Sequence, residues 1–241
     1  METLRKAFWL ARFEFNVSKI HYLILIPMIG IYAVFFNLTM DTYLEDNLFL
    51  VDILLIVYLY TISFMGKPKG LQYQKMDASF YASPYFTMLN QLPIKHKVLA
   101  ASRFFSPYFA VFLGMVLVLI STYILSTELR EAIAPLPFIS LIFIWLCISF
   151  SLGGQFPASE PGHQIKRFTL FWSYVIIFLF FILLYLIFQL WLGIGLFNWT
   201  ITLANEYPIL SIIVSILGSG LMMFYWFRYS LKQIQKNDYL Q

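Results

Sequence analysis

Apolar runs of about 18 residues or more recur along this chain, and a helix of that length can cross the ~30 Å hydrocarbon core of a bilayer. In lipid, only helices and closed barrels satisfy their own backbone hydrogen bonds, so these runs constrain the fold strongly. The composition agrees, because 61% of the 241 residues are hydrophobic and 12% are charged, against roughly 25% charged in soluble domains. The sequence predicts an all-α integral membrane protein, with residues 1–241 as a single transmembrane domain.

Hydropathy along the chain predicts six transmembrane helices separated by short polar segments. Apolar sequence after the fifth span continues to about Phe197, and Gly193 and Gly195 predict a break there, followed by a short element at the outer surface. Residues 66–103 form the one sizeable aqueous loop. The predicted spans are residues 21–38, 48–65, 104–125, 135–155, 168–190 and 209–227.

The basic residues indicate which side of the membrane each loop faces. All but one of the 16 Lys and Arg residues fall on one side of the six-span arrangement, and the exception is Arg130. The positive-inside rule therefore predicts a multi-pass protein of the cell membrane with both termini in the cytoplasm. The net charge of +4 is explained by these loops and needs no nucleic-acid partner.

Residues 1–20 form an amphipathic segment ahead of the first predicted span. Leu4 and Ala11 mark its apolar face, and the basic residues follow a polar stripe with a period of about 3.5. We expect this helix to lie in the inner membrane interface, in contact with the lipid bilayer. A plain charged anchor would explain the charges but not their phasing. The aromatic and basic residues that carry this prediction are Arg5, Phe8, Arg12, Phe15 and Lys19.

Motifs for catalysis, nucleotide binding or metal binding are missing from the sequence. The nearest match to a phosphate-binding loop, at Gly66 and Lys67, has Thr61 in place of the first glycine and Pro68 in place of the hydroxyl residue. The three histidines have no partners at metal-ligand spacing. We therefore expect a chain that is not an enzyme and binds no cofactor itself.

Two further features lie inside predicted spans. Asp52 falls about one turn from the outer end of the second span, where it can reach water. An interfacial or structural role is expected for Asp52, and a role on a transport pathway is the alternative. In the sixth span, small residues that predict close helix packing, or a subunit interface, are Ser211, Ser215, Gly218 and Ser219.

The stretch LPIKHKV begins at Leu92, near the end of the polar loop. Pro93 suits the first turn of a helix, because its missing amide hydrogen is not needed there. The predicted helix would run along the inner surface into the third span, with Lys95, His96 and Lys97 as a basic knob in the cytosol.

This arrangement resembles the type-2 permease subunits of ATP-binding cassette (ABC) exporters. The residue-level resemblance is carried by Leu92, Pro93, Ile94, Lys95 and Lys97. It implies a non-catalytic transport subunit whose cytoplasmic coupling helix docks on a separate ATPase subunit, where ATP and Mg²⁺ bind. It also implies a second permease copy, identical or related. The aromatic-rich spans, with few polar residues on a pathway, predict an amphipathic or lipophilic cargo such as a drug or a peptide. The alternative is an ATP-independent membrane immunity or binding protein for a peptide or lipid.

Overall fold

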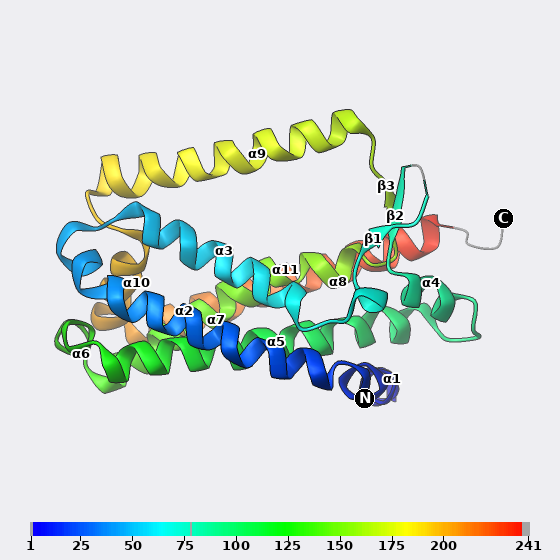
Figure 1. The fold of residues 1–241 in the computed structure, drawn as a ribbon, viewed down its shortest axis with the longest axis horizontal. Helices are drawn as coiled ribbons and strands as arrows, with labels where there is room; N and C mark the ends of the chain where they lie inside the picture. Colours follow the sequence, from blue (N-terminus) through cyan, green and yellow to red (C-terminus); the bar gives the residue numbers. More distant parts are fainter. Residues whose placement is uncertain (1, 78, 238–241) are drawn as a thin grey trace.

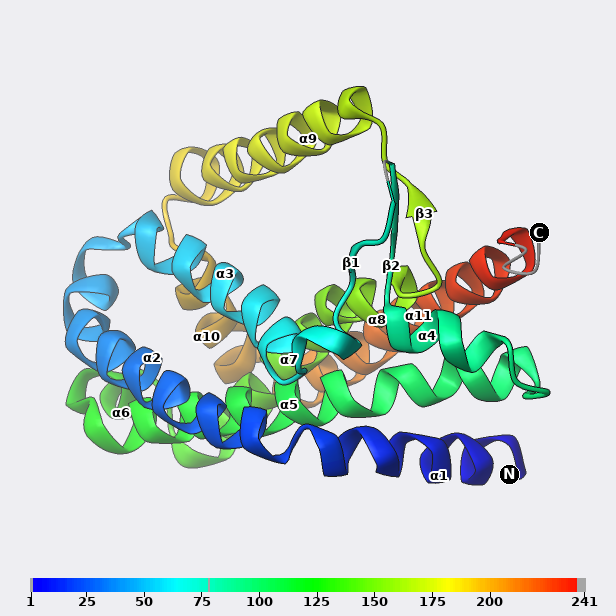
Figure 2. The same ribbon diagram turned by 45° about the vertical axis from the view of Figure 1, so that its right-hand side comes forward.

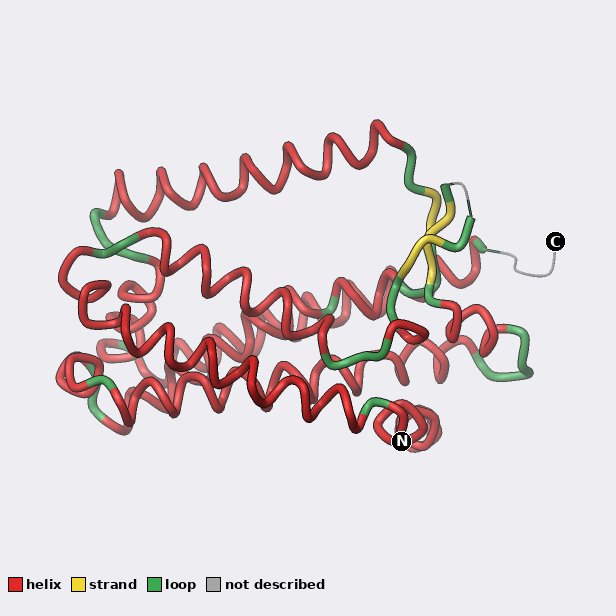
Figure 3. The backbone as a smooth tube through the Cα atoms, in the orientation of Figure 1, coloured by secondary structure: helices red, strands yellow, loops and turns green. Residues whose placement is uncertain are grey.

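The computed structural model describes residues 2–77 and 79–237, and 84% of it is helical. Helices run along one long axis, and the strands lie together near one end (Figure 1, Figure 3). The predicted all-α fold class is thereby confirmed. The elements in chain order are α1 (Glu2–Val17), α2 (Lys19–Asp46), α3 (Phe49–Met65), the 3-10 turn η1 (Lys69–Leu71), β1 (Gln74–Lys75), β2 (Phe80–Ala82), α4 (Pro84–Asn90), α5 (His96–Leu125), α6 (Thr127–Ala132), α7 (Pro135–Gly153), α8 (Gln155–Ser159), β3 (His163–Gln164), α9 (Arg167–Tyr185), the π-helical segment η2 (Leu186–Leu192), α10 (Leu196–Glu206) and α11 (Pro208–Lys236).

Within the described residues, five helices are long and apolar enough to cross a membrane, which indicates a multi-pass membrane protein. They are α2, α5, α7 with its continuation α8, α9 with η2, and α11. The second predicted span corresponds to α3, which has 17 residues. At 1.5 Å per residue it spans about 26 Å, somewhat less than the ~30 Å hydrocarbon core. Five candidate crossings are therefore seen, with α3 as a shorter apolar helix beside them.

The main hydrophobic core lies between α2, α3, α5, α7 and α10. At its centre Trp145 is fully buried, and its indole Nε1 donates a hydrogen bond to Thr200 Oγ1 at 3.0 Å. Helices α3 and α5 approach closely at Gly114, whose carbonyl accepts a hydrogen bond from the Tyr58 hydroxyl at 3.0 Å. Such contacts need small residues because packing of this kind, rather than the hydrophobic effect, holds helices together in lipid.

Helix α9 stands apart from this core (Figure 1, Figure 2). Only 6% of the 18-residue apolar stretch of α9 is buried within the chain, against 39% for the corresponding stretch of α5 and 50% for that of α7. Its large apolar side chains are exposed around the helix, from Phe168 to Tyr185. A surface of this kind must be covered by lipid or by another protein chain.

The start of α1, the end of α11 and the polar loop lie at the same end of the molecule, here called the loop end (Figure 1). A small antiparallel sheet in the order β1-β2-β3 joins residues 66–95 to the segment that follows α8. In its register Tyr81 pairs with both Lys75 and His163. The predicted long loop is thus partly structured, and it is shorter than expected because α5 already begins at His96.

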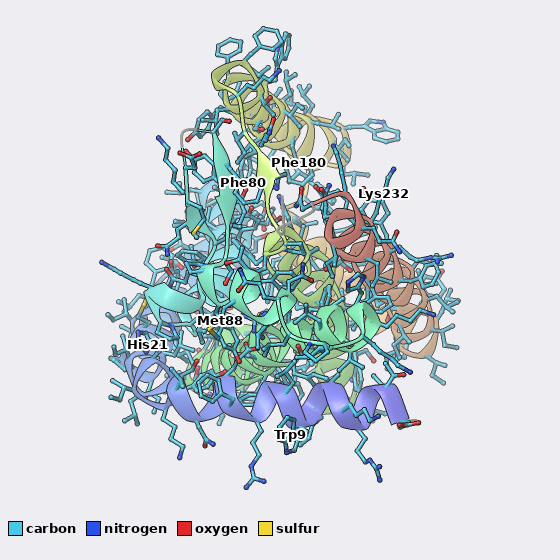
Figure 4. The ribbon with its side chains drawn as sticks, turned by 90° about the vertical axis from the view of Figure 1, so that its right-hand side faces the viewer. Trp9, His21, Phe80, Met88, Phe180 and Lys232 are labelled. Carbon is cyan, nitrogen blue, oxygen red and sulfur yellow. The ribbon has the colours of Figure 1, made fainter. Side chains whose placement is uncertain are left out.

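Helix α1 crosses the loop end rather than continuing along the bundle. It is seen end-on in Figure 1 and lengthwise in Figure 4, where the side chain of Trp9 points away from the other helices. Trp9 is 74% exposed. An orientation across the bundle axis is the one that an interfacial helix requires.

The close approach at Gly114 leads to a test of the core. Because a Cβ atom on Gly114 would overlap the Ile62 side chain, Gly114→Ala should lower stability by about 1–3 kcal/mol. The measurement is thermal unfolding of the purified protein in detergent. In the matched control, Gly220→Ala, the added Cβ meets nothing within 4 Å, so that variant should be neutral or slightly more stable. Equal stabilities of the two variants would contradict this packing.

Candidate functional site at the loop end

The turn that carries the LPIKHKV stretch connects α4 to α5. Helix α4 begins with a capped turn, in which the Ser83 hydroxyl accepts a hydrogen bond from the Phe86 amide at 3.4 Å. After α4 the chain turns tightly, with the Ile94 amide donating to the Leu92 carbonyl at 2.6 Å. Lys95 is the N-cap residue of α5, with extended backbone angles of φ −59° and ψ 129°. The α4–turn–α5 unit is called the hairpin below.

The prediction that Pro93 opens the helix is wrong. Pro93 lies in the turn, and α5 begins three residues later at His96. The physical reason is that the Lys95 carbonyl accepts the first helical hydrogen bonds, from Val98 at 2.8 Å and Leu99 at 3.1 Å. The side chains around the turn nevertheless divide as expected. Ile94 is half-buried, whereas Leu92, Pro93, Lys95, His96 and Lys97 are exposed.

A second hydrophobic cluster holds the hairpin in place. Phe86 and Leu89 of α4 pack against Leu99 and Ala100 of α5 and against Ile234 near the end of α11. Partly buried side chains from α1 and from the turn complete this cluster, namely Leu10 and Ile94. The hairpin is therefore a packed unit with its own small core and an exposed tip.

Four buried charged side chains lie at the loop end, beside the hairpin. Arg103, on α5, bridges the carboxylates of Glu14 and Glu160 through its Nη1 and Nε atoms. Lys67, just after α3, donates to Glu160 Oε1 at 2.5 Å and lies 3.8 Å from Glu14 Oε2. All four are at most 4% exposed. These residues are called the ion cluster.

The ion cluster is electrically balanced but not fully hydrogen-bonded. Two acids face two bases, which is the condition for keeping such charges away from water. The Tyr85 ring lies 5.0 Å from the Arg103 guanidinium carbon and adds a cation–π contact. Glu14 Oε2 and Arg103 Nη2 have no hydrogen-bond partner among the described residues. Burial raises the pKa of the Glu14 carboxyl, and the Arg103 and Lys67 cations oppose that effect.

The sequence reasoning missed the ion cluster. It counted Lys67 and Arg103 as loop bases on the basic side, yet both are buried. One signal was available, because Glu14 falls three residues after Ala11 on the apolar face of the first helix. A carboxylate on such a face predicts a buried partner. The sequence held no comparable signal for Glu160.

The packed face of the predicted interfacial helix includes Ala11, as expected, but leaves Leu4 and Phe8 exposed. Ala7, Ala11 and Glu14 are fully buried, whereas Phe8 is 55% exposed. Small side chains allow α1 to lie close to α5. The aromatic rings reach α5 from the sides of the helix, with Phe8 5.6 Å from Phe105 and Phe15 5.5 Å from Phe109 between centroids. The basic residues remain on the exposed surface, namely Arg5, Arg12 and Lys19.

Asp52 lies at the other end of the molecule and, contrary to expectation, does not reach water. It is 0% exposed, because the start of α10 folds over it. The two carboxylate oxygens accept hydrogen bonds from the Leu196 amide at 2.8 Å and the Phe197 amide at 3.0 Å. The Tyr43 hydroxyl donates to the same carboxylate at 2.7 Å. Asp52 thus caps the N-terminus of α10 from another helix.

The predicted break after the fifth span also occurs at this end. Gly193 has φ +67°, a left-handed conformation that favours glycine. The amide of Gly195 donates to Asn47 Oδ1 at 3.0 Å. These contacts fix the short helix α10 against the α2–α3 connection.

The small-residue stripe of α11 is divided between two environments. Ser211 and Ser219 are buried against the body of the chain, where α11 packs along α7, and Ser215 is half-buried. Gly218 is exposed, and a Cβ atom added there would meet nothing within 4 Å. Gly218 therefore takes no part in helix packing within one chain.

Searches against protein-family models, curated proteins and solved structures found no match for this chain. No group of three or more His, Cys, Asp or Glu residues in the described part of the chain is placed to hold a metal ion. Three pockets between the helices each have a volume of about 10 Å³. That volume is about enough for one water molecule.

A substitution of Asp52 tests its capping role, the alternative to a role on a transport pathway. Asp52→Ala removes the acceptor of two buried amides and one hydroxyl, so we expect a stability loss of about 1–3 kcal/mol. Thermal unfolding in detergent measures it. The exposed neighbour Asp46 provides the control, Asp46→Ala, which should stay within about 0.5 kcal/mol. An unchanged unfolding temperature for Asp52→Ala would contradict the capping role.

Proposed function

We propose that this chain is the membrane subunit of an ABC-type exporter, driven by a separate ATPase subunit. The observation that carries the proposal is the hairpin, which presents an exposed basic tip on a packed base. In the proposed topology α3 is a sixth crossing and both termini lie in the cytoplasm of the cell, together with the hairpin. The charge distribution supports that orientation.

The hairpin suits a docking role for physical reasons. A tip that receives force must be exposed, and its base must be held firmly enough to pass the force on. Leu92 is 49% exposed and can fill an apolar groove, while Lys95 and Lys97 can pair with acidic residues at its rim. The ATP chemistry, with its Mg²⁺, belongs to the partner in this proposal.

A second copy of the permease, identical or related, completes the pathway in this proposal. Helix α9 and much of α11 expose apolar side chains. Only 6% of the 18-residue apolar stretch of α9, and 11% of that of α11, is buried within the chain. The three pockets described above each hold about one water molecule, and this proposal places the cargo pathway between chains. We propose an amphipathic or lipophilic cargo, such as a drug or a peptide, on the basis of the aromatic-rich spans.

The test is co-purification of the tagged full chain with candidate ATPase subunits encoded beside it. Charge reversal at the tip, with Lys95→Glu and Lys97→Glu combined, should weaken the association at least about tenfold, because rim charges then repel the acidic partner. The control is Lys69→Glu, an exposed lysine of the same polar loop away from the tip, which should bind as the unmodified protein does.

Two results would count against the proposal. One is the failure of every candidate ATPase to co-purify with the unmodified chain. The other is transport or resistance that survives both the tip substitutions and deletion of the neighbouring ATPases. The second result would favour an ATP-independent immunity or binding protein instead.

A further inference from the structure

The ion cluster contains one cation with two acids within reach. The ammonium of Lys67 is bonded to Glu160 Oε1 at 2.5 Å, and Glu14 Oε2 lies only 3.8 Å away. That Glu14 oxygen is fully buried and has no hydrogen-bond partner among the described residues. Lys67 thus already forms an ion pair with both acids, and a shift of its ammonium by little more than 1 Å would shorten the longer pair to hydrogen-bond distance.

The surroundings allow this movement. A pocket of about 10 Å³ borders Lys67 and Glu160, with aromatic walls that include Phe64 and Phe156. Lys67 stands between the end of α3 and the 3-10 turn η1, so its backbone is not inside a helix. Gln72 ties the Lys67 carbonyl to the loop through a hydrogen bond of 2.6 Å. A displacement of that loop would therefore shift the Lys67 backbone and, with it, the Lys67 side chain.

Arg103, by contrast, is bonded to both acids at once and is 0% exposed. Arg103 therefore keeps both carboxylates beside Lys67. The two acids belong to different parts of the loop end. Glu14 is on α1, and Glu160 leads into β3, with its carbonyl accepting a hydrogen bond from the Ser83 amide at 3.1 Å.

We infer that Lys67 is the moving part of a two-position ionic switch, and that it strengthens the attachment of either α1 or the β3 segment. Residues 159–165 are called the β3 segment here. Each position gives Lys67 a short hydrogen bond to one carboxylate, and a displacement of the loop would select between the two positions. In the exporter proposed above, on which this functional reading rests, the hairpin would cause that displacement. The switch itself requires no ATPase.

The test is hydrogen–deuterium exchange, read by mass spectrometry, on the full chain in lipid nanodiscs. Glu160→Gln removes the carboxylate charge that holds Lys67, so Lys67 should move to Glu14, the one carboxylate that remains in the ion cluster. Exchange in α1 should then become about tenfold slower, as expected for one added hydrogen bond between charged groups. Exchange in the β3 segment should become faster. In the double variant Glu160→Gln with Lys67→Met, the slowing in α1 should disappear.

Two further variants serve as a second test of the switch and as a control on α1. Glu14→Gln alone leaves the cluster with the same net charge as Glu160→Gln, and it should speed exchange in α1 alone, because Lys67 stays bonded to Glu160. Glu2→Gln is the control on the same helix, because Glu2 pairs with Lys6 on the exposed surface at 2.6 Å. It should change exchange only in the first turn of α1.

The outcomes separate a switch from a fixed structural cluster. If Glu160→Gln loosens α1 and the β3 segment together, the cluster is a fixed block and the inference is wrong. The inference also fails if Glu14→Gln loosens both segments, or leaves both unchanged. None of these results bears on whether an ATPase binds the hairpin, so the two proposals stand or fall separately.

Discussion

The loop end of this protein depends on the mutual neutralisation of four buried charges. Removing one partner of a buried ion pair costs about 3–5 kcal/mol, because the remaining charge is left without compensation in a poorly polarisable environment. Glu14, Lys67, Arg103 and Glu160 come from four separate parts of the chain. The positions of α1, the end of α3, the start of α5 and the β3 segment are therefore fixed relative to one another by one local condition.

The rest of the molecule can be understood from this fixed point. On one side lies the main apolar core, and on the other the small cluster that supports the hairpin. A polar layer between two apolar regions is a natural place for movement, because ion pairs can be exchanged whereas a close-packed apolar core resists deformation. Glu14 Oε2 lies beside Lys67 and has no hydrogen-bond partner among the described residues. It therefore offers the Lys67 ammonium a second position.

The opposite end of the chain uses a polar group for rigidity instead. Asp52 satisfies two amides at the start of α10 and a tyrosine hydroxyl, all at once. Both oxygens of this buried carboxylate accept hydrogen bonds, from three donors in all. Asp52 thus acts as a fixed cap of α10. Lys67 has a second carboxylate 3.8 Å away and can change its partner.

The sequence by itself determined the features that depend on local composition. Apolar run lengths located the long helices, the glycines near residue 193 located the break before α10, and the phasing of residues 1–20 indicated a helix apart from the spans. The tertiary structure alone decided the partners. It buried Lys67 and Arg103, drew Asp52 away from water and moved the start of α5 past Pro93. The burial of Lys67, Arg103 and Asp52 depends on contacts between residues as many as 145 positions apart, and hydropathy or helical periodicity carries no information about such pairs.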